Sequence, residues 1–72
     1  MSERLLEVYP NEMEARMWES ILLEEGIRSL VKPHLEVNPY FGHATFLPHA
    51  LYVMDEDIPR ARGIIGKAEG NG

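Results

Sequence analysis

Three histidines in or beside one proline-rich stretch are the residues of this chain best suited to bind a metal ion. They are His34, His43 and His49, and a fourth ligand would have to be Glu36 or Asn38. Imidazole nitrogens and carboxylates are ligands that zinc and nickel accept. The spacings match no established metal motif such as H-E-x-x-H. The histidines are therefore weak candidates, and the simpler interpretation is that they are polar loop residues without a common ligand.

An acidic triplet is the second group of chemical interest. Asp55, Glu56 and Asp57 could bind a cation or act as general acid and base. They directly precede Ile58 and Pro59, where a helix is predicted to begin. Negative charge at a helix N-terminus is favourable because of the helix macrodipole. Since this role explains all three carboxylates, we assign them to the helix start.

The remaining sequence gives no catalytic signature. The chain has no cysteine, which excludes thiol catalysis, thiolate metal sites and disulfides. Its serines and Thr45 lie in no G-x-S-x-G context, and no glycine-rich phosphate loop precedes a helix. We therefore expect a protein that is not an enzyme and that uses no cofactor.

Size and charge limit the classes of partner. A chain of 72 residues with 44% hydrophobic and 26% charged residues is typical of one folded domain. Its net charge is −5, and its lysines and arginines are scattered, which disfavours nucleic acid because phosphate binding depends on clustered basic residues. No apolar run approaches the roughly 20 residues of a membrane span, and the first residues contain no apolar signal segment. We therefore expect a cytoplasmic protein with neither nucleic-acid nor membrane partners.

The stretch from residue 11 to residue 27 predicts the helix around which the other elements are arranged. Asn11 can cap its start, because its side chain can accept from backbone N–H groups of the first turn. Gly26 can end it, because glycine readily adopts the left-handed conformation. At about 100° per residue, five apolar residues fall within one arc: Ala15, Met17, Trp18, Ile21 and Leu22. Trp18 is therefore expected in the core.

Three short segments predict strands, and a second helix follows the last of them. The strands span residues 4–9, 27–32 and 49–54, of which the last is the most apolar. Pro33 is expected to end the second strand, because proline removes a ladder donor. Gly63 and Gly66 weaken the second helix by about 1 kcal/mol each relative to alanine. Its apolar stripe is formed by Ile58, Ala61, Ile64 or Ile65, and Ala68.

The element order β-α-β-β-α restricts the fold. A right-handed crossover makes the first two strands parallel with a gap between them, and the apolar third strand fills that gap antiparallel to both. We therefore predict an α+β, ferredoxin-like sandwich with a three-stranded antiparallel sheet of order 1-3-2 and both helices on one face. It forms a single domain over residues 1–68, followed by a disordered tail at residues 69–72.

One face of this sheet is left without a helix. Strand alternation directs one set of residues toward the helices: Leu6, Val8, Ile27, Val31, Leu51 and Val53. It directs a second set away from them: Leu5, Tyr9, Leu30, Tyr52 and Met54. Such an apolar patch marks an interaction site. Either the connection between residues 33 and 48 or a second subunit could cover this patch. Separately, the first strand lies at an open edge of the sheet, where it could pair with the same strand of a second copy.

Three segments of the sequence resemble a known family. They are LLEVY at residues 5–9, EARMWESILLEEGI at residues 14–27 and LYVMDEDIPRARGII at residues 51–65. They resemble DUF2007, a family of small bacterial domains of unknown function described as prokaryotic signal-transducing proteins. The resemblance implies a ferredoxin-like, PII-like fold, in which the connection between the second and third strands senses partners and ligands. Some relatives carry a cysteine zinc ribbon, which this cysteine-free chain does not contain, and the family provides no catalytic residues.

Two functional hypotheses remain open. The first is a non-enzymatic, signal-transducing interaction module that acts through the exposed sheet face and the long connection, as a homo-oligomer (dimer or trimer) or with another protein. Its candidate partner-binding residues are Leu5, Tyr9, Leu30, Tyr52, Met54, Tyr40, Phe41 and Phe46. The second is a small-ligand or metal-ion sensor that uses the loop histidines.

Overall fold

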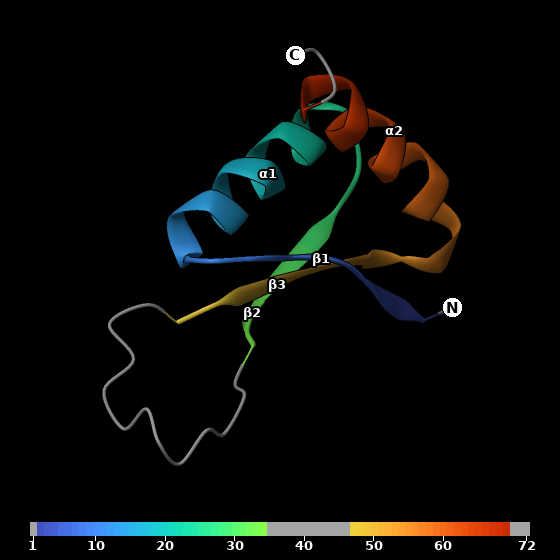
Figure 1. The fold of residues 1–72 in the computed structure, drawn as a ribbon. Coiled ribbons are helices and arrows are strands. Elements are labelled where there is room, and N and C mark those ends of the chain that lie inside the picture. The colour runs from blue at the N-terminus through green and yellow to red at the C-terminus, as the bar shows by residue number, and fades with distance from the viewer. Residues whose placement is uncertain (1, 35–46, 70–72) are drawn as a thin grey trace.

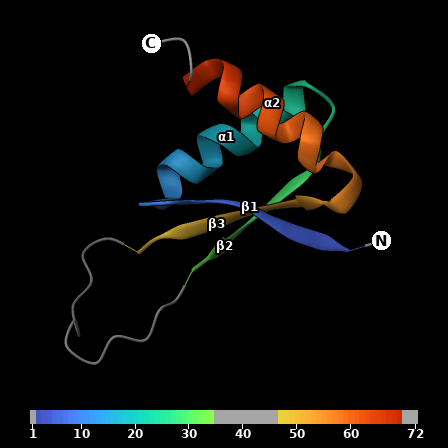
Figure 2. The same ribbon diagram turned by 45° about the vertical axis from the view of Figure 1, so that its right-hand side comes forward.

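The computed structural model describes residues 2–34 and 47–69. Its elements are, in order, β1 (Glu3–Tyr9), α1 (Glu12–Glu24), β2 (Ser29–Pro33), β3 (His49–Met54), the short 3-10 helix η1 (Asp55–Asp57) and α2 (Ile58–Glu69). The sheet has the order β1-β3-β2, and both strand pairs are antiparallel. Figures 1 and 2 show both helices on the same side of this sheet. The predicted α+β fold and its strand order are therefore confirmed.

The first helix begins and ends where the sequence predicts. The side-chain oxygen of Asn11 accepts a 2.8 Å hydrogen bond from the backbone N–H of Glu14. At the other end, Gly26 has a φ of 81°, and the N–H of Ile27 donates to the carbonyl of Leu22 over 2.9 Å. The N–H of Gly26 also donates to the carbonyl of Leu23 over 2.9 Å. These two bonds at the helix end form a Schellman motif, which satisfies carbonyls that would otherwise stay unpaired. The motif turns the chain directly into β2.

The helical stripe is narrower than predicted. Ala15, Trp18 and Leu22 are buried, which confirms the core position of Trp18. Met17 is half exposed, so its predicted place in the stripe is wrong. It lies about 100° around the helix from Trp18 and so falls at the solvent edge of the helix. The helix therefore faces the core with Ala15, Trp18 and Leu22, and Ile21 packs beside them partly buried.

The core lies between the helices and the sheet. α1 packs mainly against β2 and β3, whereas α2 packs against β1 and β3. Of the two adjacent isoleucines in α2, Ile65 is buried and Ile64 is only partly buried. The guanidinium of Arg60 donates to the backbone carbonyl of Glu25, which joins α2 to the end of α1. Among the described residues, the buried cluster between the helices and the sheet consists of Leu6, Tyr9, Ala15, Trp18, Leu22, Ile27, Val31, Leu51, Val53, Ala61 and Ile65.

β1 contains a β-bulge at Leu6. In the register with β3, Leu5 lies opposite Tyr52 whereas Glu7 lies opposite Leu51, so Leu6 has no partner of its own. An extra residue of this kind disrupts the ladder locally. Because strand side chains alternate with a period of two, it also reverses the facing of every residue that follows.

The bulge exchanges the positions of Tyr9 and Val8. Tyr9 lies on the helix side, where it is 3% exposed and stacks against Trp18 with ring centroids 6.4 Å apart. Val8 lies on the opposite side and is exposed. The predictions that Tyr9 faces away from the helices and that Val8 faces them are therefore wrong.

Pro33 is the last residue of β2 rather than its terminator. It lies opposite His49, and beyond it the N–H of His34 donates to the carbonyl of Pro48 over 2.8 Å. Bonded and non-bonded pairs alternate along an antiparallel ladder, so Pro33 occupies a non-bonded pair, whose backbone groups point away from β3. The strand does end at Pro33, but its missing N–H removes no ladder bond, so the predicted reason for that end is wrong.

Candidate functional site

The side of the sheet opposite the helices forms a surface that we call the open face. It is built of cross-strand rows: Leu5, Tyr52 and Leu30 form the central row, Val8, Ala50 and Lys32 form the second, and Glu3 and Met54 begin the third, next to Arg28. Leu5, Val8 and Leu30 are 45%, 36% and 42% exposed. The central row therefore contains no charged residue on any of the three strands; the charged side chains come from the neighbouring rows.

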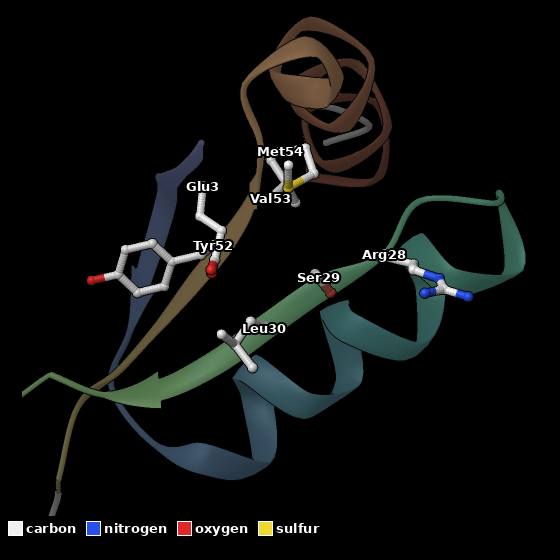
Figure 3. A pocket seen from close by; sticks show the side chains of 7 residues that line it. All are labelled: Glu3, Arg28, Ser29, Leu30, Tyr52, Val53 and Met54. Atoms are coloured by element: carbon white, nitrogen blue, oxygen red, sulfur yellow. The ribbon is translucent and has the colours of Figure 1, made fainter. Parts of the chain in front are cut away.

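A shallow hollow of about 280 Å³ lies at one end of the open face. Figure 3 shows the side chains that line it: Glu3, Arg28, Ser29, Leu30, Tyr52, Val53 and Met54. They come from all three strands, except Arg28, which directly precedes β2. The lining is mostly apolar, so the hollow is suited to an apolar side chain of a partner rather than to a charged small molecule.

Lys32 and Glu3 reach over the open face from its opposite outer strands. The ammonium of Lys32 lies 4.0 Å from a carboxylate oxygen of Glu3 and 4.9 Å from the centre of the Tyr52 ring. Both charged side chains are about half exposed, so the ion pair contributes little stability. The pair instead limits access to Tyr52, because it covers part of that ring. Leu5 and Leu30 stay accessible beside it.

Four of the predicted partner-binding residues lie together on the open face: Leu5, Leu30, Tyr52 and Met54. Tyr9 is buried in the core and is not part of this surface. Tyr40, Phe41 and Phe46 lie outside the described residues. Val8 belongs to the surface and was missed, because no glycine marks the bulge that redirects it. The one available signal was the adjacent pair Leu5 and Leu6, which an alternating strand does not explain.

The two described histidines do not form a common site. His49 is buried, and its Nδ1 donates to the backbone carbonyl of Leu47 over 2.8 Å. By strand alternation, His49 belongs to the helix side and His34 to the open face. His43, Glu36 and Asn38 lie outside the described residues. In the part of the chain that the structure describes, no group of three potential metal ligands occurs.

The acidic triplet forms η1, directly before α2. Asp55 accepts a 2.9 Å hydrogen bond from the guanidinium of Arg4, and both side chains are more than half exposed. Its backbone N–H donates to the carbonyl of Ser2 over 2.9 Å. The triplet therefore stands at the helix start, as predicted, and its first residue also joins the end of β3 to the beginning of β1.

Comparison with known proteins gives one match. The sequence matches the family DUF2007, described as "Putative prokaryotic signal transducing protein", over residues 5–69. The matched segment runs from the third residue of β1 to the end of α2, so it includes β2 and β3 in full and most of β1. No curated protein and no solved structure match the chain. Within residues 2–34 and 47–69, no helix has the length and apolar character needed to span a membrane.

Proposed function

Because the chain belongs to the DUF2007 family, whose description is that of signal-transducing proteins, we propose that it is a non-enzymatic signalling module that binds proteins through its open face. The observation that supports this proposal is the central row of the open face. Leu5 and Leu30 remain exposed there, although a domain of this size has few large apolar residues to spare from its core. An exposed apolar patch of this kind marks a protein-binding site.

We further propose that a second copy of the chain binds this face. A two-fold interface uses the same patch on both subunits, so the patch must be complementary to itself. The central row meets this condition because it presents an accessible leucine on each outer strand, Leu5 on β1 and Leu30 on β2. The charged residues at its margins, Glu3 on β1 and Lys32 on β2, have opposite signs and already approach within 4.0 Å in one subunit. They therefore do not present a like-charge barrier to association.

The molar mass in solution tests this proposal. Light scattering over roughly a tenfold concentration range should give a mass above the 8.2 kDa of one chain, and this mass should rise with concentration. Leu5→Asp places a charge in the central row and should shift the protein toward the monomer. Met13→Asp is the matched control, because Met13 is 82% exposed on α1 and lies off the open face. A wild-type chain that stays at 8.2 kDa throughout would contradict self-association.

A further inference from the structure

The backbone of β2 has free hydrogen-bonding groups along its outer edge. The His34–Pro48 pair is hydrogen-bonded, and bonded pairs recur at every second residue of an antiparallel ladder. Lys32 and Leu30 therefore direct their backbone groups toward β3.

The residues of β2 that alternate with Leu30 and Lys32 direct their backbone groups away from β3. Ser29 and Val31 each present one N–H and one C=O at the edge of β2, and Pro33 presents a C=O. In the described part of the chain no strand pairs with this edge. An extended segment of another chain could bond to these groups and continue the sheet.

The outer edge of β1 is less suited to such pairing. The bulge at Leu6 interrupts its regular spacing, and the N–H of Val8 lies 3.3 Å from the carboxylate of Glu7, which accepts from it. Bulges and charged side chains are the devices by which natural sheets prevent pairing at their edges. Of the two edges, β2 is therefore the one able to accept a further strand.

The start of β2 also has a hollow on each side of the sheet. One is the hollow of the open face. The other, of about 210 Å³, lies on the helix side and is lined by Glu19, Ser20, Leu23, Arg28 and Ser29. Successive side chains of a strand point to opposite faces, so a strand added beside Ser29 and Leu30 would place neighbouring side chains at the two hollows. It would also contact Leu23, which the core leaves exposed.

Charge determines which kind of segment fits. Lys32 follows Leu30 by two residues on the open face, and Arg28 precedes it by two residues, just ahead of β2, where it lines both hollows. Arg28 makes no ion pair with any described residue, and in Figure 3 its guanidinium points away from Tyr52. The complementary pattern on an added strand is acidic, apolar, acidic at every second residue.

A second copy of β2 does not supply this pattern. The antiparallel register that pairs Ser29 of one copy with Val31 of the other satisfies all four of their outward groups. In that register Arg28 of one copy lies opposite Lys32 of the other. Like charges directly opposite one another are destabilising, and this contact would occur twice.

We propose that the edge of β2 binds an extended acidic segment of a partner protein by antiparallel strand addition. Its apolar residue lies beside Leu30 and its carboxylates lie beside Arg28 and Lys32. The inference rests on the proposed function, because it specifies a partner of a protein-binding module. It uses the strand edge, however, and not the central row through which the chain is proposed to self-associate.

A charge-exchange experiment tests the side-chain part of this inference. Fluorescence anisotropy would follow a labelled, capped peptide of sequence SEVLVES binding to the full chain, with its glutamates beside Lys32 and Arg28. Arg28→Glu should weaken binding by about tenfold and should be rescued by the peptide SEVLVKS, whose lysine takes the position beside residue 28. Arg62→Glu is the matched control, because it makes the same charge change on an exposed position of α2 and should leave the affinity unchanged.

A second series of peptides tests the backbone part. N-methylation of the two valines of SEVLVES removes the N–H groups that would donate to Ser29 and Val31, and it should abolish binding. N-methylation of the leucine removes an N–H that points away from β2 and should change little. Binding that survives valine methylation, or that ignores Arg28→Glu, would overturn strand addition at β2.

Leu5→Asp separates the two proposals. Leu5 lies on β1, across β3 from the β2 edge, so this variant should bind the peptide as the wild type does even where it no longer self-associates. An oligomer that does not bind the peptide would refute the β2 edge alone. A monomer that binds it would refute self-association alone.

Discussion

The two faces of the sheet carry similar residues but have different roles. Leu51 and Leu30 lie on neighbouring paired strands, β3 and β2, yet Leu51 is fully buried beneath the helices whereas Leu30 is exposed on the open face. The amino-acid type is the same, but Leu51 lies on the central strand beneath α1 and α2, whereas Leu30 lies on an edge strand and faces away from the helices. The difference teaches that a leucine in this sheet contributes to stability beneath the helices and is available for binding at the edge of the open face.

Truncating one leucine on each face should give the largest contrast in stability. Leu51→Ala removes a fully buried side chain and should lower the free energy of unfolding by about 2–5 kcal/mol. Leu30→Ala removes a side chain that solvent already reaches and should lower it by less than about 1 kcal/mol. Urea denaturation at low protein concentration measures both values. Equal losses would mean that the open face is covered in the monomer.

The next contrast tests the bulge that assigns Tyr9 and Val8 to their faces. Tyr9→Leu loses the stacking on Trp18 and part of the buried area, and it should lower stability by about 1–2 kcal/mol. Val8→Leu adds a methylene on the open face and should stay within about 0.5 kcal/mol of wild type. Thermal unfolding followed by circular dichroism compares the two variants. A destabilising Val8→Leu with a neutral Tyr9→Leu would restore the unbroken alternation and contradict the bulge.

Tyr9 and Val8 also show which parts of the fold could be predicted from the sequence. The element order and the apolar third strand were sufficient for the sheet order, because the handedness of crossovers leaves few alternatives. Asn11 and Gly26 act through their immediate backbone neighbours, so their roles could be predicted from local sequence. The facing of Tyr9 and Val8 depends on one extra residue, whose position is decided by packing against β3 and the helices. The adjacent leucines Leu5 and Leu6 are the only local sign of it, and they do not by themselves specify its position.

The proposed site was predictable to the same extent. Leu30 and Tyr52 follow the plain alternation of uninterrupted strands, so their place on the open face could be inferred from the sequence. The free edge of β2 could not, because it depends on which residues of the ladder are bonded to β3. Pro33 illustrates this dependence on the register. Its backbone nitrogen faces away from β3, so the lack of an N–H there costs no bond within the sheet.

A smaller contrast concerns two glycines in the layer that covers the helix side. Gly26 has a φ of 81°, a conformation that costs an L-residue about 1–2 kcal/mol, so Gly26→Ala should destabilise the domain by that amount. The alanine Cβ would meet only the end of Arg60 at 3.9 Å, so steric contact adds little. Gly63 lies within α2 with no heavy atom within 4 Å of an added Cβ, and Gly63→Ala should stabilise the domain by up to about 1 kcal/mol. Urea denaturation measures the change in the free energy of unfolding for each variant. Changes of opposite sign would confirm that backbone conformation decides both effects.

The last contrast, between stability and binding, concerns Lys32 on the open face. Lys32→Met keeps most of the aliphatic stem but removes the ammonium from Tyr52 and Glu3, and exposed contacts of these kinds each contribute at most about 1 kcal/mol. The free energy of unfolding should therefore change by less than about 1 kcal/mol. The affinity for SEVLVES should fall severalfold, because one of its glutamates loses its partner, whereas Lys67→Met, on the last turn of α2, should change neither quantity. A variant that loses stability as strongly as it loses affinity would place Lys32 among the residues that hold the fold together and would remove the distinction between the two faces.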